Sequence, residues 1–143
     1  MVSPPLRTIA LVDDDMGVRD SLRFLLETAG YVVEAYASGT QFLAEARPEV
    51  LACLVLDHEM PQITGLELLT RLRNAGLAPP TLLVTSMPSR NITRLAATLG
   101  AVGVLEKPFE QEDLLAWIEH AIASRPQAGF SAAPLPPPAR QGW

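Results

Sequence analysis

Carboxylate, hydroxyl and ammonium side chains follow four separate apolar runs of this 143-residue chain. The four sites are Asp13 and Asp14 after residues 9–12, Asp57 after residues 54–56, Thr85 after residues 82–84, and Lys107 just past residues 104–105. Hard divalent cations take oxygen ligands, and both a hydroxyl and an ammonium can donate hydrogen bonds to phosphoryl oxygens. These residue types together suit metal-assisted phosphoryl transfer, provided that the fold gathers them.

The elements around these residues supply a way to gather them. Apolar runs alternate with segments of helical spacing, which predicts repeated strand–helix units and a parallel sheet. We expect five strands, at residues 8–13, 31–36, 51–56, 81–85 and 102–105, and the third is apolar enough to be buried on both faces. The helices that follow the strands should end near Gly30, before Pro48, near Gly76, at residue 99 and at Arg125.

This order of elements predicts a doubly wound α/β fold, with right-handed crossovers that place helices on both faces of the sheet. In such a sheet the carboxyl ends of the strands line one edge, and ligands bind there. Each of the four polar sites lies at or just past the carboxyl end of an expected strand. The sequence therefore predicts one crevice that holds three carboxylates, a hydroxyl and an ammonium.

Four motifs in this chain resemble the receiver domain of two-component response regulators. They are VDDD at residues 12–15, LDHEMP at residues 56–61 with Gly65, VTS at residues 84–86, and EKPF at residues 106–109. Their order and spacing match the family from about Arg7 to about Arg125, so we expect a receiver domain over residues 1–125. The resemblance implies a flavodoxin-like fold with strand order 2-1-3-4-5.

The resemblance also implies a role for each site residue. Asp57 is the expected nucleophile and phosphoryl acceptor, Lys107 the cationic clamp, and Thr85 the switch that senses the new phosphoryl group. Mg²⁺ is the expected cofactor, since a bound cation offsets the cost of ionising neighbouring carboxylates. Its expected ligands are Asp14, Asp57, the backbone carbonyl of Glu59 and, mainly through water, Asp13.

The implied function is a phosphorylation-activated signalling switch in a phosphorelay. Its phosphoryl donor is expected to be a sensor histidine kinase or a histidine phosphotransfer protein, and it catalyses only its own phosphorylation and slow dephosphorylation. The output is expected to pass through a phosphorylation-dependent homodimer or an output protein. Two interpretations of Trp117 stay open, packing against its own domain or anchoring a partner on the face of the last helix.

One position departs from the family pattern. Three residues before the lysine the family often has an aromatic side chain, whereas this chain has Val104. A valine has no ring that can change between buried and exposed positions. The output face is the expected surface of the fourth helix, the fifth strand and the fifth helix. The departure predicts that Thr85 communicates with this face by loop movement or only weakly.

Two other functions compete with the receiver interpretation. A haloacid-dehalogenase-like phosphatase would use Asp13 as nucleophile, Asp15 as acid/base and Lys107 as its lysine. Against it, Met16 and Gly17 follow Asp15, where such a phosphatase would have a small polar residue. In addition, no paired acidic motif follows Lys107. A receiver-like module that no longer accepts phosphate is the other alternative, and the intact set of site residues argues against it.

The charge and composition of the chain exclude further classes of protein. The net charge of −5 and pI of about 4.9 argue against non-specific nucleic-acid binding. The N-terminus lacks a signal-peptide pattern, and no apolar run reaches the roughly 20 residues of a membrane span, so we expect a cytoplasmic protein without membrane association. Residues 126–143 are rich in Pro and Ala and predict a disordered tail or linker, with no output domain within this chain.

Overall fold

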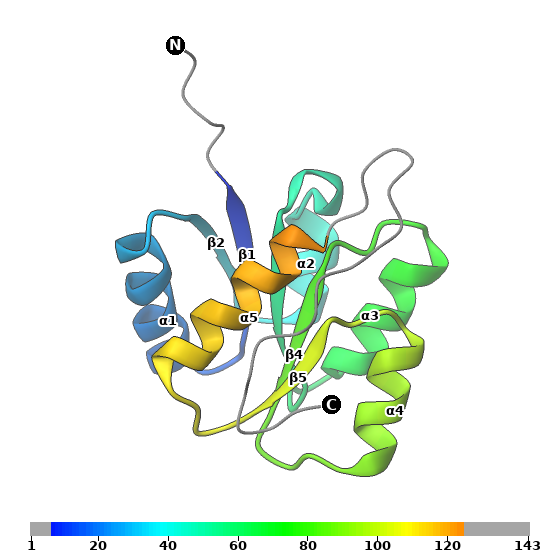
Figure 1. Ribbon diagram of the computed structural model, residues 1–143. Coiled ribbons are helices and arrows are strands. Elements are labelled where there is room, and N and C mark those ends of the chain that lie inside the picture. The colour runs from blue at the N-terminus through cyan, green and yellow to red at the C-terminus, as the bar shows by residue number, and fades with distance from the viewer. Residues whose placement is uncertain (1–6, 125–143) are drawn as a thin grey trace.

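A five-stranded parallel sheet of order β2-β1-β3-β4-β5 forms the centre of the molecule (Figure 1). The structure is a computed structural model that describes residues 7–124. Its strands are β1 (Thr8–Val12), β2 (Val32–Tyr36), β3 (Cys53–Asp57), β4 (Thr81–Thr85) and β5 (Gly103–Glu106). The fold class and strand order that the resemblance implied are confirmed.

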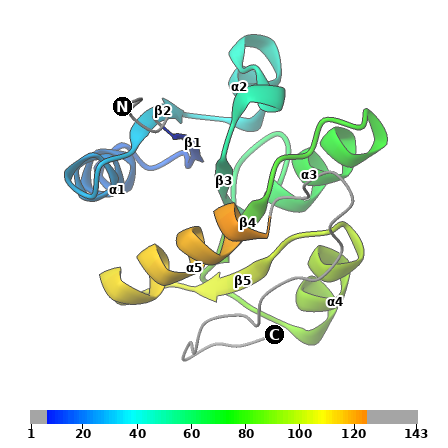
Figure 2. The same ribbon diagram turned by 45° about the horizontal axis from the view of Figure 1, so that its top comes forward.

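Helices cover both faces of this sheet. They are α1 (Met16–Thr28), α2 (Gly39–Glu45), α3 (Gly65–Asn74), α4 (Arg90–Thr98) and α5 (Gln111–Ala123), with a short 3₁₀ turn, η1 (Pro48–Val50). Figure 2 shows α1 and α5 on one side of the sheet and α2, α3 and α4 on the other. Alternate side chains of β1 point to opposite faces, so that Ile9 and Leu11 pack with α1 and α5 while Ala10 and Val12 pack with the other helices.

Local sequence explains where the helices begin and end. Four helices begin after a capping side chain that accepts a hydrogen bond from a backbone N–H three residues later; the capping residues are Asp15, Ser38, Thr64 and Ser89. Gly30, Gly76 and Gly100 have positive φ just past the ends of α1, α3 and α4. The predicted helix ends at these glycines are therefore confirmed.

The third strand begins later than predicted. The predicted strand covered residues 51–56, whereas β3 is Cys53–Asp57. Leu51 donates its N–H to the carbonyl of Pro48, which closes the η1 turn and keeps Leu51 out of the sheet. All five residues of β3 are buried, as its continuous apolar run predicts. Asp57 is thus the last residue of the strand and lies at the carboxyl edge of the sheet.

Gly65 allows α3 to start close to the carboxyl end of β3. A Cβ at this position would lie 2.6 Å from the carbonyl oxygen of Asp57 and 2.9 Å from Cα of His58. Both atoms belong to the backbone and cannot move aside without moving the acidic residue. The glycine in the LDHEMP…G motif thus has a packing role beside the pocket.

The buried side of α5 differs from the predicted apolar stripe. The prediction placed Trp117 beside a stripe of Leu114, Leu115, Ile118 and Ile122. In the structure the buried residues of α5 are Leu114, Trp117, Ile118 and Ala121, and Trp117 is only 1% exposed. Its ring fits over Gly103 of β5, where an added Cβ would meet ring carbons at 2.6 to 2.9 Å. Trp117 therefore packs in its own domain, and the partner-anchor interpretation is wrong.

Two further predictions concern the ends of the chain and membranes. Within residues 7–124, no helix combines the length and the apolar character that crossing a bilayer requires. Arg125, the predicted end of the last helix, and the predicted tail at residues 126–143 lie outside the described residues.

Candidate functional site

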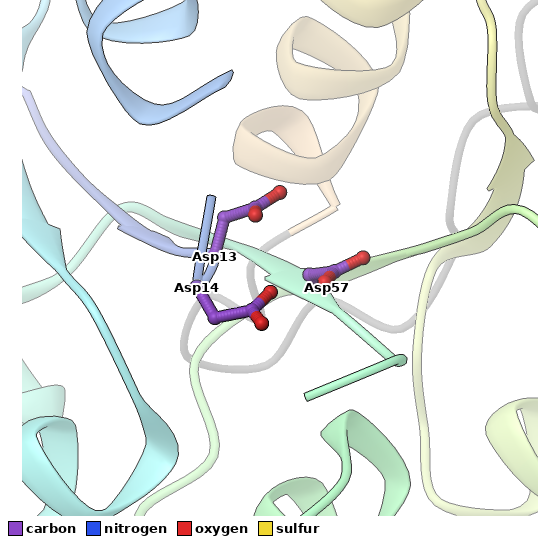
Figure 3. Close-up of side chains that lie close together, drawn as sticks. All are labelled: Asp13, Asp14 and Asp57. Atoms are coloured by element: carbon purple, nitrogen blue, oxygen red, sulfur yellow. The ribbon is translucent and has the colours of Figure 1, made fainter. Parts of the chain in front are cut away.

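Three aspartates form an acidic pocket at the carboxyl edge of the sheet. One carboxylate oxygen from each of Asp13, Asp14 and Asp57 lies within 4.8 Å of the others. Figure 3 shows the three side chains close together at the carboxyl ends of β1 and β3. Asp13 and Asp57 are buried, whereas Asp14 is exposed and opens the pocket to solvent. Such a cluster of oxygen donors with one open side fits a hard divalent cation that keeps some of its waters.

The sheet register brings the aspartates together. β1 and β3 pair in parallel with Val12 opposite Leu56, so the next residues, Asp13 and Asp57, lie at the same level at the carboxyl edge of the sheet. Arg19 of α1 donates a hydrogen bond of 2.8 Å from Nη1 to the backbone carbonyl of Asp13. This contact fixes the turn that carries the first two aspartates. Sequence reasoning missed Arg19, because nothing in the motif marks a backbone-binding residue six positions downstream.

Lys107 reaches the pocket from the loop after β5. Its Nζ lies 3.2 Å from Oδ2 of Asp13 and 3.0 Å from Oδ1 of Asp57. The Lys107–Pro108 peptide bond is cis. Burial by itself lowers the pKa of Lys107, but the carboxylates of Asp57 and Asp13 outweigh it and raise that pKa above the usual value. The ammonium therefore stays charged beside the acidic pocket.

Among the residues of the site, Asp57 has an unusual electrostatic environment, which changes the pKa of its carboxyl group. Burial raises the pKa of Asp57 to about 6, Lys107 opposes this rise, and the neighbouring charge of Asp13 adds to it. Although its Oδ1 forms the ion pair with Lys107, that buried oxygen accepts no well-directed hydrogen bond from the residues described. A buried carboxylate oxygen without such a bond is costly unless another group occupies the pocket. The residues present therefore fit a bound cation or phosphoryl group.

Thr85 lies at the end of β4, beside the pocket, and is fully buried. Its hydroxyl donates a hydrogen bond to Oε2 of Glu59 and accepts one of 3.1 Å from the N–H of Met87. The other oxygen of Glu59 accepts hydrogen bonds from Ser86, at 3.0 Å from N and 3.3 Å from Oγ. Burial raises the pKa of Glu59, but the bonds from Thr85 and Ser86 outweigh this and lower it.

The side chain of Glu59 was not predicted to act in this way. Sequence reasoning assigned the backbone carbonyl of Glu59 as a metal ligand, but it did not foresee that the carboxylate would accept hydrogen bonds from Thr85 and Ser86. The one available signal is that Glu59 and Ser86 each follow a strand end, on the neighbouring strands β3 and β4.

Val104 and Asp15 have structural positions. Val104 is buried in β5 opposite Leu83, so the position at which the family resemblance implies an aromatic residue is part of the core here. Asp15 caps α1 by accepting a hydrogen bond of 3.0 Å from the N–H of Val18. It lies outside the acidic cluster of Asp13, Asp14 and Asp57.

Comparison with known proteins agrees with this geometry. The family model of the response regulator receiver domain matches residues 9–119. The transcriptional regulatory protein FixJ of Bradyrhizobium diazoefficiens is 39% identical over 125 residues, which are 87% of this chain and 61% of FixJ. The response regulator protein TodT of Pseudomonas putida is 32% identical over 124 residues, 87% of this chain and 55% of TodT. The chain thus spans about three fifths of these relatives.

Solved structures show the same fold. The chemotaxis protein CheY4 of Vibrio cholerae superposes with a TM-score of 0.76 at 30% identity, covering 82% of this chain and 99% of that one. FixJ-N superposes with a TM-score of 0.75 at 34% identity, covering 90% of this chain and 99% of that one. These matches favour the receiver over the dehalogenase-like phosphatase. With its acidic pocket of Asp13, Asp14 and Asp57, the chain belongs to the response regulator receiver domain family of two-component signalling.

Proposed function

We propose that this receiver is a phosphorylation-activated switch whose Asp57 accepts a phosphoryl group from a histidine kinase or a histidine phosphotransfer protein. The observation that carries the proposal is the position of Asp57. Its buried carboxylate is one of the three in the acidic pocket, lies at the end of β3, and is 3.0 Å from the Lys107 ammonium. A carboxylate held beside fixed positive charge is suited to attack phosphorus and form an acyl phosphate.

The residues divide the work of the transfer between them. A carboxylate oxygen of Asp57 forms the new bond to phosphorus, and the bond from phosphorus to the donor's imidazole nitrogen breaks, with its electron pair leaving on that nitrogen. Lys107, which pairs with Asp13 and Asp57 in this structure, turns to a phosphoryl oxygen during the transfer. There its ammonium stabilises the negative charge on the phosphoryl group. Thr85 then donates its hydroxyl proton to another phosphoryl oxygen, which draws the β4–α4 loop toward the pocket.

The same pocket suits Mg²⁺. We assign Asp14, Asp57 and the backbone carbonyl of Glu59 as its direct protein ligands, and Asp13 as a ligand mainly through water. When bound, Mg²⁺ supplies positive charge against the phosphoryl oxygens and the clustered carboxylates. The protein contributes the fixed carboxylates that hold the ion and the open side at Asp14, through which donor and water enter.

Mg²⁺ binding is expected to weaken as the pH falls through the pKa of Asp57, which burial raises to about 6. Protonated Asp57 cannot coordinate the ion, so below that pH the association constant should fall by up to about tenfold per pH unit. Titration calorimetry between about pH 7 and about pH 5 measures this dependence, with Asp57→Asn as the control that should lose most of the slope. Equal affinity across that range in the parent contradicts the assignment.

The proposed function is tested by incubating the protein with acetyl phosphate, with and without Mg²⁺, and measuring its intact mass. A stable addition of one phosphoryl group that requires Mg²⁺ supports the switch. Release of inorganic phosphate by steady turnover without an adduct supports a phosphatase instead. An unchanged mass with the parent, repeated with a histidine kinase as donor, supports a receiver-like module that no longer accepts phosphate.

We further propose that residues 1–125 form the receiver and residues 126–143 a linker, and that output passes through α4, β5 and α5. Arg90 and Arg94 lie one turn apart on α4 and are exposed, and Glu106 of β5 and exposed Glu119 of α5 offer opposite charge. Exposed ion pairs contribute only about 0–1 kcal/mol each, so these charges select a homodimer or output partner more than they hold it. Sedimentation with and without beryllofluoride, a phosphoryl mimic, distinguishes self-association from a separate partner.

A further inference from the structure

The Thr85 hydroxyl is already fully engaged in this structure. Thr85 is completely buried, its oxygen accepts a hydrogen bond from the N–H of Met87, and its proton is donated to the Glu59 carboxylate. A hydroxyl has a single proton and can make one strong donation at a time. Any new acceptor in the pocket must therefore take that proton away from Glu59.

We propose that the Glu59 side chain is a positioning residue that competes with the phosphoryl group for Thr85 and so holds the switch in its resting arrangement. The inference rests on the proposed function, in which Thr85 donates to a phosphoryl oxygen of modified Asp57. The phosphoryl group and the carboxylate are alternative anionic acceptors for one proton. Phosphorylation then shifts the loop only to the extent that the phosphoryl oxygen binds Thr85 better than Glu59 does.

The contacts of Glu59 suit such a role. One carboxylate oxygen accepts from Thr85, and the other accepts from both the backbone N–H and the hydroxyl of Ser86. Glu59 follows β3 and Ser86 follows β4, so the carboxylate joins the β3–α3 loop to the β4–α4 loop, whose strands are neighbours in the sheet (Figure 2). Because bonds to a charged acceptor are stronger than bonds to a neutral one, the charge of Glu59 strengthens the resting arrangement.

The matching variant is Glu59→Gln, which keeps the length and acceptor oxygen of the side chain but removes its charge. We expect its dissociation constant for beryllofluoride, measured at saturating Mg²⁺ by amide chemical shifts, to be about tenfold lower than that of the parent. Melting curves of the metal-free proteins establish that the variant is folded. The affinity for beryllofluoride is the readout because the two roles change it in opposite directions. If Glu59 only supported the fold, its substitution would weaken binding, whereas the proposed competition predicts tighter binding.

Removing a negative charge near an anion site also strengthens anion binding directly, so a second pair of proteins separates the two causes. Thr85→Val removes the hydroxyl at nearly constant shape, and Glu59→Gln is then introduced into that background. If Glu59 acts through Thr85, the gain from Glu59→Gln should be at least about fivefold larger with the threonine present than without it. A purely electrostatic effect gives the same gain in both backgrounds.

The outcomes of this cycle separate the inference from the function beneath it. A gain in the parent background that exceeds the gain in the Thr85→Val background by about fivefold or more supports the inference. A smaller difference, or no gain in the parent background, overturns it while leaving the proposed function intact. A parent that does not bind beryllofluoride with Mg²⁺ contradicts the proposed function, and the inference with it.

Discussion

Asp57→Asn is expected to abolish incorporation of a phosphoryl group from acetyl phosphate or a histidine kinase. The substitution keeps the volume of the side chain at the end of β3 but removes the nucleophilic carboxylate and one of the three pocket charges. Intact mass after incubation with donor and Mg²⁺ measures the loss. The effect should be complete, because the two carboxylates that remain in the cluster, Asp13 and Asp14, are assigned to holding Mg²⁺.

Asp15→Asn is the matched control for this experiment. Asp15 belongs to the same acidic run but caps α1 instead of joining the pocket, and asparagine is an equally good N-cap residue. This variant should be phosphorylated as readily as the parent. Normal phosphorylation of Asp57→Asn, or equal loss in both variants, would contradict the assignment of Asp57.

Trp117→Ala is expected to lower the free energy of unfolding by about 3–5 kcal/mol, the range for a fully buried aromatic residue. The indole is 1% exposed and fills the space between α5 and Gly103 of β5. Its removal leaves a cavity that the sheet and helix cannot close without moving. Urea denaturation of the parent and the variant measures the difference.

Phe24→Ala supplies the control, since Phe24 is an aromatic residue of α1 that is 74% exposed. Its loss should change the free energy of unfolding by no more than about 0.5 kcal/mol. If Trp117→Ala proved as mild as Phe24→Ala, the packing of α5 described above would be incorrect. The contrast also separates burial from aromatic character, because both variants remove an aromatic ring from a helix.

The fold and the acidic pocket could be predicted because both follow from short-range sequence signals. Apolar runs located the strands, and the glycines with positive φ located the ends of three helices. Parallel strands then place Asp13 and Asp57 at the same edge of the sheet, and the register confirms this. The strand order came from the family resemblance, since periodicity does not choose neighbours.

The remaining features depend on contacts between distant parts of the chain. Glu59 and Thr85 are 26 residues apart, and their hydrogen bond depends on how two loops leave adjacent strands. The burial of Trp117 depends on Gly103, whose missing side chain leaves room for the ring. The apolar stripe on α5 alone could not select between Trp117 and Leu115, because the rotation of a helix about its axis is set by what it packs against.

The position of the phosphoryl group is the most direct test of the account. Borohydride reduces an aspartyl phosphate to the alcohol and so converts the modified aspartate to homoserine, which tandem mass spectrometry locates in a peptide. Protein treated with acetyl phosphate and Mg²⁺, then reduced, should carry this change at Asp57 and at neither Asp13 nor Asp14. Reduction at Asp13, the nucleophile of the dehalogenase-like alternative, or a phosphorylated protein with unmodified Asp57, would contradict the proposed switch.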